Sequence, residues 1–148
     1  MKKIWMAVMA TVLTGMAQAD IVRVPASQSV AATMDALETA VAGAGATVFA
    51  RIDHGGGAQS IGASLAPWEL LVFGHPRLGT PAMQDAAEAG LALPLRVLVY
   101  EDAEGQVWLA YEDPTAMLTA FDGIAADAPY LATMTGALSK LTGVAAGQ

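Results

Sequence analysis

The sequence predicts an α+β fold, a two-layer β-α-β4-α sandwich in which two helices pack on an antiparallel sheet. Strand-like runs alternate with tight polar corners between residues 47 and 112, and an apolar helical stripe stands on either side of that block. Amphipathic helices need a sheet face to cover their apolar side. The opening β-α-β order would also suit a parallel α/β fold, but the hairpin at residues 93–112 lacks a crossover helix and argues against it.

The first nineteen residues have the pattern of a secretory signal peptide. Lys2 and Lys3 precede an apolar run at 4–16, and Ala17-Gln18-Ala19 is a small-residue cleavage site. The alternative, a membrane anchor, is disfavoured because the run is shorter than the ~20 residues that span a bilayer. We therefore expect a periplasmic or secreted protein with no membrane span after cleavage, and a single domain at residues 20–148.

Charge and cysteine content exclude several classes of protein. The chain has 7 basic and 14 acidic residues, a net charge of −7, which becomes −9 once Lys2 and Lys3 leave with the signal. Such a chain is repelled by phosphate backbones, and its basic residues are scattered, so we expect no nucleic-acid partner. Cysteine is absent. Stability must therefore come from a hydrophobic core instead of disulfides.

The first half of the mature chain predicts a strand, a helix and a second strand. Residues 20–24 alternate as a strand that Pro25 ends. Ser29 is the expected N-cap of a helix that ends at the glycines 43 and 45. Residues 47–53 are β-branched and aromatic, which predicts a strand. A glycine-rich turn follows at 53–57, with one helical turn expected at 58–64.

The second half predicts three more strands and two helices. A strand at 68–73 stops at Gly74-His75-Pro76, and Thr80 is expected to cap a helix that runs from Pro81 to Ala89. Strands at 93–100 and 107–112 form a hairpin with Gly105 at a positive φ. Asp113 and Pro114 then begin the C-terminal helix, whose stripe Pro129 interrupts.

Four segments together carry a family resemblance. They read R-I-D-H, F-G-x-P-x-x-G-T-P-x-M, L-P-L-R-V-L-V-Y-E-D and V-W-x-x-Y-x-D-P, and the region from Val22 to Met117 resembles the domain-of-unknown-function 302 family. The resemblance implies a sandwich of the TATA-box-binding-protein-like class, often a homodimer, with no assigned reaction or cofactor. The family pattern usually has Asn after F-G where this chain has His75, which implies that His75 is not essential to any chemistry the family shares.

The two histidines are the first candidates for chemistry. His54 follows Asp53 at a strand end and is either a proton carrier, a metal ligand or a side chain that hydrogen-bonds the corner. His75 follows another strand. If the two strands are neighbours, both imidazoles could share one sheet edge and, with the Met83 thioether, bind copper, or else zinc or haem.

A second candidate region is the step Gly79-Thr80-Pro81. Thr80 and the first amides of its helix, with Arg77 nearby, could hold an anion, and the alternative is an ordinary helix cap. Tyr111 could line a cleft between sheet and helix. We therefore expect His54, Arg77, Gly79, Thr80 and Tyr111 to bind a ligand if they converge.

Three functional hypotheses follow. The first is a module that binds a small ligand or a partner protein. The second is a metal or haem site at His54 and His75. The third is an acid–base enzyme with His54 as proton carrier and Asp53 or Glu112 as its partner. The chain has no cysteine and no G-x-S-x-G elbow, so no nucleophile stands out, and the sequence names no cofactor.

Overall fold

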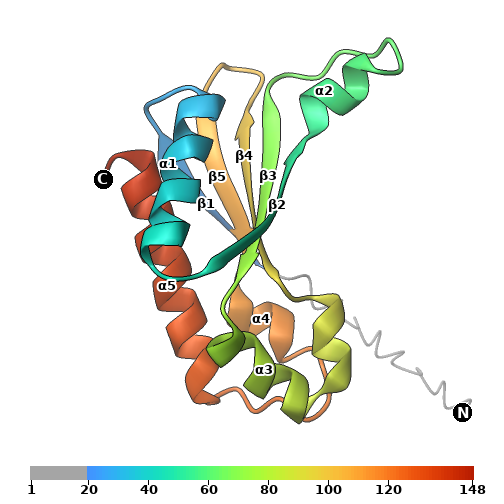
Figure 1. The fold of residues 1–148 in the computed structure, drawn as a ribbon, viewed down its shortest axis with the longest axis vertical. Coiled ribbons are helices and arrows are strands. Elements are labelled where there is room, and N and C mark those ends of the chain that lie inside the picture. The colour runs from blue at the N-terminus through green and yellow to red at the C-terminus, as the bar shows by residue number, and fades with distance from the viewer. Residues whose placement is uncertain (1–19) are drawn as a thin grey trace, which may run out of the picture.

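A computed structural model describes residues 20–148 of the chain (Figure 1), and the predicted signal peptide lies outside this range. Five strands form one antiparallel sheet in the order β1-β5-β4-β3-β2. Within the described residues, no helix combines the length and the apolarity that crossing a membrane requires. The predicted α+β class is confirmed. The strands are β1 (Ile21–Ala26), β2 (Thr47–Asp53), β3 (Trp68–Gly74), β4 (Leu95–Glu101) and β5 (Val107–Glu112).

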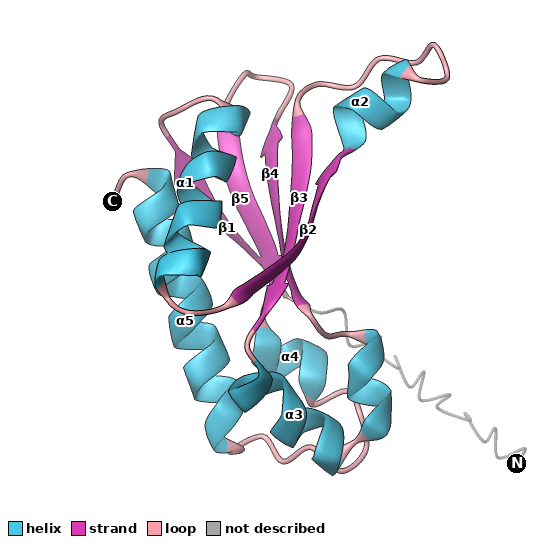
Figure 2. Cartoon of the chain, viewed as in Figure 1, coloured by secondary structure: helices cyan, strands magenta, loops and turns pink. Residues whose placement is uncertain are grey.

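The helices lie on one side of this sheet and below it (Figure 2). The two longest, α1 and α5, pack against each other and against the strands. The shorter helices gather at the end of the sheet where β3 ends and β4 begins, except α2, which projects from the opposite end (Figure 1). The helices are α1 (Val30–Gly43), α2 (His54–Gln59), α3 (Pro76–Asp85), the 3-10 helix η1 (Ala87–Leu91), α4 (Pro114–Leu118) and α5 (Pro129–Ala146).

The hydrophobic core lies between the sheet and helices α1 and α5. Along β4 and β5, buried residues alternate with partly exposed ones because successive strand side chains point to opposite faces. The buried set faces the helices, and the other set forms a sheet face that no helix within residues 20–148 covers. The fully buried large side chains include Leu71, Val97, Val99 and Leu109 from the sheet, Met34, Leu37 and Val41 from α1, and Leu131, Met134 and Leu138 from α5.

Several predicted helix and turn signals are confirmed. The hydroxyl of Ser29 accepts a hydrogen bond from the Ala32 amide at 3.3 Å, and Gly45 follows the end of α1 with a φ of +74°. Asp113 caps α4, where its Oδ1 accepts from the Ala116 amide at 2.9 Å. Gly105 has the expected positive φ in the β4–β5 hairpin.

Strand β1 extends two residues beyond its predicted end, because Pro25 does not stop it. This strand pairs only with β5 and lies at the edge of the sheet. A proline is tolerated there because its missing N–H faces away from any partner strand.

The glycine run forms a helix, and the prediction of a turn followed by one helical turn at 58–64 is wrong. Helix α2 begins at His54, since the Asp53 carboxylate caps it by accepting from the Gly56 amide at 2.8 Å. A Cβ on Gly56 would lie 2.5 Å from Asp53 Oδ2, so glycine at this position leaves room for the cap. With residues 60–66, α2 extends from the sheet as an arm (Figure 1).

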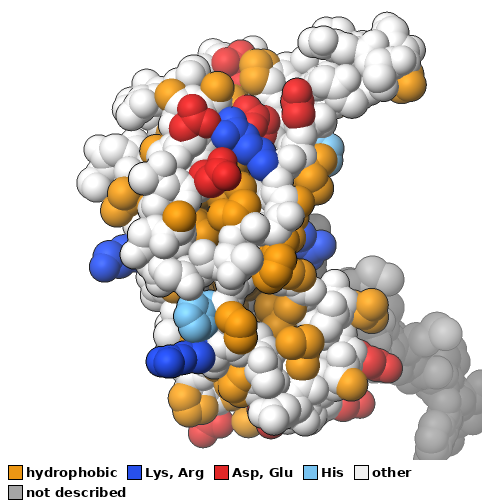
Figure 3. Space-filling model, in the orientation of Figure 1, with side chains coloured by type: hydrophobic (Ala, Val, Ile, Leu, Met, Phe, Trp, Pro, Cys, Tyr) orange, Lys and Arg blue, Asp and Glu red, His pale blue; other side chains and the backbone are white. Residues whose placement is uncertain are grey.

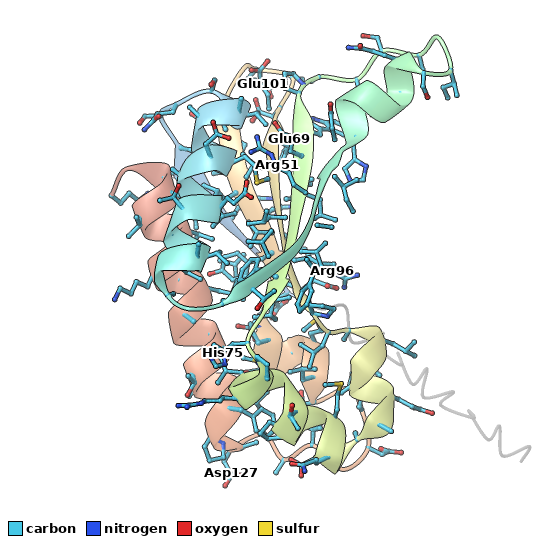
Figure 4. All side chains as sticks on the ribbon, in the orientation of Figure 1. Arg51, Glu69, His75, Arg96, Glu101 and Asp127 are labelled. Atoms are coloured by element: carbon cyan, nitrogen blue, oxygen red, sulfur yellow. The ribbon has the colours of Figure 1, made fainter. Side chains whose placement is uncertain are left out.

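The Arg51 guanidinium ties three elements together (Figure 4). It donates to Glu69 of β3 and to Asp35 of α1 at 2.6 Å, and it approaches Glu38 of α1 at 3.3 Å. The hydrogen bonds to these carboxylates raise the pKa of Arg51 above its ordinary value, so the cation is fixed. Arg51 therefore places one positive charge among three carboxylates where the first helix crosses the sheet.

Candidate functional site

An apolar pocket with a volume of about 320 Å³ lies at the end of the sheet opposite the arm. It forms where the end of β3 continues into α3, beside the start of β4 and against α5. Hydrophobic side chains make most of its wall, and His75 and Thr80 are its polar side chains. The pocket is lined by Phe49, Gly74, His75, Pro76, Leu78, Gly79, Thr80, Met83, Leu93, Pro94, Leu95 and Met134.

His75 begins α3 and lies on the pocket wall. Its Nδ1 accepts a hydrogen bond from the Arg77 amide at 3.2 Å, and Pro76 occupies the first helical turn. A neutral imidazole whose Nδ1 accepts a hydrogen bond carries its proton on Nε2. The ring is half-buried. It therefore offers one N–H donor beyond the helix cap in a largely apolar lining whose other polar side chain is Thr80.

Two glycines keep this pocket open. A Cβ on Gly79 would meet Leu93 Cδ1 at 3.8 Å and Met83 Cε at 3.9 Å, which are ordinary contacts. A Cβ on Gly74 would meet Phe49 and Pro94, each at 3.5 Å. Side chains at either position would therefore occupy space that the pocket now has.

Two methionines and one phenylalanine complete the wall. Met134 of α5 is buried, with 1 % of its surface exposed, whereas Met83 of α3 is 42 % exposed. Phe49 follows Val48 at an irregularity in the β2–β3 register and is 60 % exposed. Unbranched thioether side chains adapt to the shape of what they contact. The pocket thus combines a buried wall with an exposed apolar rim.

The prediction that Thr80 caps a helix is wrong. Helix α3 begins at Pro76, so Thr80 and Pro81 lie inside it and the amides near Thr80 are not free helix ends. The sequence placed Pro81 at the first helical position, whereas in the structure Pro76 takes that position and the imidazole of His75 supplies the cap. The predicted anion site at Gly79-Thr80-Pro81 therefore has no exposed helix N-terminus.

His54 and His75 do not share a sheet edge. Strands β2 and β3 are neighbours but antiparallel, with Asp53 opposite Glu69 and Thr47 opposite Gly74. The two histidines therefore stand at opposite ends of a seven-residue strand pair, about 20 Å apart at ~3.3 Å per residue. Figure 3 shows the histidines as two separate patches. The prediction that both imidazoles of the chain bind one metal ion is therefore wrong. Within residues 20–148, no group of three or more His, Asp or Glu side chains could hold a metal.

The remaining predicted residues also lie away from the pocket. His54 lines a shallow hollow of about 590 Å³ between the arm and the open face of the sheet, together with Trp68 and Leu98. The Arg77 side chain is exposed. Tyr111 faces α5, where burial raises the pKa of its phenol. Of the ligand set predicted from sequence, only Gly79 and Thr80 line this pocket.

The proposed acid–base partners of His54 have other roles. The Asp53 carboxylate caps α2, and Glu112 accepts a hydrogen bond from Arg96 at 3.0 Å. Neither carboxylate lines the hollow that contains His54. The structure does not assemble the acid–base set in one place.

A comparison with known families settles the membership of the chain. The family described as domain of unknown function DUF302 matches residues 22–141. The chain is a DUF302 protein. The residues that line the pocket all lie within the matched range, and most come from two stretches, 73–83, which supplies residues 74–76, 78–80 and 83, and 93–95.

One solved structure agrees with this assignment. The crystal structure of an uncharacterized conserved DUF302 protein from Bacillus stearothermophilus has the same fold, with a TM-score of 0.67, 18 % identity, and coverage of 86 % of this chain and 95 % of that one. Proteins named fluoride-specific ion channel FluC 1 from Brucella suis biovar 1 (strain 1330) and Brucella abortus biovar 1 (strain 9-941) are each 40 % identical over 128 residues, 86 % of this chain. The chain spans about half the length of these relatives.

Sequence reasoning missed Phe49, Leu93 and Met134 as pocket residues. Each was interpreted as part of a strand or of an apolar stripe, which is correct for Phe49 and Met134, whereas Leu93 lies just before β4. The four segments that carry the family resemblance could have indicated the pocket, since two of them line it. Their convergence depends on the β2–β3–β4 order, which periodicity alone does not define.

Proposed function

We propose that this DUF302 chain is an exported module that binds a small apolar ligand in the pocket beside α3. The observation that carries the proposal is the pocket itself, a largely apolar space of about 320 Å³ whose wall comes mainly from the family segments. Pockets for small molecules typically have volumes of ~300–1,000 Å³ and few polar groups. This pocket lies near the lower limit, which favours a compact ligand.

The lining also defines which polar group such a ligand would carry. His75 Nε2 is a donor, and the wall around it is apolar. A hydrogen-bond acceptor on the ligand, such as a carbonyl or ether oxygen, would satisfy that donor, and the rest of the ligand would displace water from Leu78, Leu93 and Met134. Burial of apolar surface supplies most of the binding free energy in such a site.

Titration with the fluorescent probe N-phenyl-1-naphthylamine tests this proposal. We expect saturable enhancement of its emission with the wild-type chain. Gly79→Leu, which fills the pocket, should weaken probe binding at least tenfold, about 1.4 kcal/mol. Gly136→Leu on α5 is a matched control, because a Cβ at Gly136 meets nothing within 4 Å. Equal probe affinity in wild type and Gly79→Leu would place any binding elsewhere.

Export is the other part of the proposal, and it rests on the signal-peptide pattern of residues 1–19. We expect the protein in the periplasmic or culture-medium fraction of a bacterial host, with Asp20 as its first residue. Mass spectrometry of the intact protein from each fraction measures this. Recovery of chains that retain residues 1–19 from the cytoplasmic fraction alone would contradict export.

A further inference from the structure

Three aromatic side chains form one cross-strand row on the sheet face that no helix covers. Trp68 of β3 is directly opposite Tyr100 of β4, which is directly opposite Trp108 of β5. Their neighbours Val99 and Leu109, on the helix side, are fully buried, whereas all three aromatic residues are partly exposed. We call Trp68, Tyr100 and Trp108 the aromatic row. It shares no residue with the pocket beside α3.

Hydrogen bonds fix both indole rings of the aromatic row. Trp68 Nε1 donates to the backbone oxygen of Glu101 at 3.0 Å, and Trp108 Nε1 donates to Asp102 Oδ2 at 2.7 Å. Asp102 is itself held by the Glu104 and Gln106 amides. The bond from Trp108, with these amides, lowers the pKa of Asp102, so the carboxylate stays ionised. Rings that are already oriented lose less conformational freedom when a ligand binds.

A hollow of about 490 Å³ continues from Tyr100 along the same face. Arg96 and Glu112 line it and are joined by the 3.0 Å hydrogen bond, with both side chains accessible to solvent. Arg23 lines its β1 side. The hollow therefore presents guanidinium donors and a carboxylate acceptor, and it meets the aromatic row at Tyr100, four residues along β4 from Arg96.

We propose that the aromatic row and this hollow bind a neutral, extended, β-linked glycan. The flat C–H faces of a pyranose stack on aromatic rings, and its hydroxyl groups both accept from guanidinium and donate to carboxylate. Strands lie ~4.8 Å apart, so Trp68 and Trp108 are anchored about 10 Å apart, roughly two sugar rings along an extended chain. The net charge of −7 disfavours polyanions, nucleic acids among them.

Sheet stability alone does not account for this arrangement. Cross-strand aromatic pairs contribute to stability on any sheet face, at about 0.2–1 kcal/mol each. Here the paired rings lie on the accessible face, both indole N–H groups are already satisfied, and the adjacent hollow contains charged groups of both signs. Together these features match the mixed apolar and hydroxyl chemistry of a carbohydrate.

Intrinsic fluorescence provides a direct test because the chain has three tryptophans, Trp5, Trp68 and Trp108. In a full-length Trp5→Phe chain, all tryptophan emission comes from the aromatic row. Titration with chitohexaose should change this emission saturably, and maltohexaose, whose α-linked chain curves, should change it at least tenfold more weakly. Tyr100→Ala should weaken chitohexaose binding at least tenfold, as loss of one stacking ring does for nucleobases. Tyr100→Phe and Gly79→Leu should bind like the parent.

Several results would overturn the proposal. One is the absence of any emission change with chitohexaose at millimolar concentration, and another is unchanged binding by a Tyr100→Ala chain whose circular dichroism matches the parent. Tighter binding of decaproline than of the glycan would assign the row to a peptide. Emission that varies with protein concentration, with a dimer in sedimentation, would assign it to contact between two copies. Because Gly79→Leu affects only the pocket beside α3, failure of the glycan result and failure of the pocket proposal are distinguishable.

Discussion

His75 shows how one side chain can serve the fold and the pocket together. Its Nδ1 caps α3 through the Arg77 amide, and its ring forms part of the apolar wall. The family resemblance implies Asn at this position, and Asn is one of the best helix N-cap residues. The two residue types therefore share the capping role, which accounts for the departure from the family pattern in physical terms.

We expect His75→Asn to leave the free energy of unfolding within about 0.5 kcal/mol of wild type, because the amide oxygen replaces the imidazole as cap. His75→Ala should cost about 1 kcal/mol through loss of the cap. Urea denaturation followed by circular dichroism measures both. Equal stability of wild type and His75→Ala would show that the imidazole does not cap the helix in solution.

Substitution of Gly79 leads to a second prediction for a single residue. Gly79→Ala and Gly136→Ala both replace a helical glycine where a Cβ fits without a close contact, so each should raise the unfolding free energy by up to about 1 kcal/mol. Only Gly79→Ala should weaken binding of N-phenyl-1-naphthylamine, because only that methyl group enters the pocket. Thermal melts and probe titrations on the same samples measure the two effects separately. A loss of stability in Gly79→Ala would mean that the wall of the pocket cannot accommodate the methyl group.

The hydrogen bond from Tyr130 should make the stability of the fold depend on pH. Its phenol donates to Asp85 Oδ2 at 2.7 Å, and burial together with this carboxylate raises its pKa from 10.0 to about 12. Because the folded state holds this proton more tightly, the contribution is intact below pH 10 and is lost as the pH rises toward 12. The melting temperature of wild type should therefore fall more between pH 9 and 11.5 than that of Tyr130→Phe. Parallel curves for the two proteins would contradict the raised pKa.

At the scale of elements, the strands were predictable and two helices were not. Alternating burial on β4 and β5 matches the alternation in the sequence, so the hairpin was predicted close to its observed bounds. Helix α2 consists largely of glycine and has little intrinsic helix propensity, and the Asp53 cap holds its first turn. Helix α3 contains Pro81, which propensity places at a helix start. In both cases one capping side chain outweighs the propensity of the residues that follow it.

The candidate site was predictable only in part. His75, Gly79, Thr80 and Met83 were singled out from one segment, and this segment does line the pocket. The stronger expectation fell on His54, which lies at the opposite end of the β2–β3 pair. The sequence does not define which strands are neighbours, and because β2 and β3 pair directly and antiparallel, the corners that follow them lie at opposite ends of the sheet.

The Arg51 cluster gives a prediction for how α1 attaches to the sheet. Arg51→Met leaves Asp35, Glu38 and Glu69 close together without a cation. We expect a loss of roughly 1 kcal/mol at low salt, which shrinks in 1 M NaCl because salt screens repulsion between accessible carboxylates. Arg96→Met is the control, since it breaks a single exposed ion pair. A loss in Arg51→Met that is independent of salt would assign it to packing.

At the scale of the whole molecule, α5 joins the sheet to the short helices at its end. It contacts α1 and β1 along one part and α3 and α4 along another. The chain should therefore unfold as one cooperative unit, as small domains usually do. The helix end of the molecule is too small to support a core of its own.

Substitutions on α5 test this cooperativity. Leu138 is 1 % exposed, so Leu138→Ala should cost about 2–5 kcal/mol. Val144 on the same helix is 54 % exposed, and Val144→Ala should change stability by less than about 0.5 kcal/mol. Urea titration followed by both tryptophan emission and circular dichroism should give coincident transitions for each protein. Separate transitions by the two probes would show that the short helices unfold on their own.

The two outer strands also determine how the protein behaves when it is concentrated. An outer strand with a regular row of free amides can recruit the same strand of a neighbouring chain and begin a fibre. In β1, Pro25 removes one amide donor and Arg23 adds a charge, and in β2 the irregularity at Phe49 breaks the repeat. Both outer strands therefore make poor templates. Concentrated stocks should stay free of β-rich fibrils, and the same three positions should be kept unchanged when the domain is engineered.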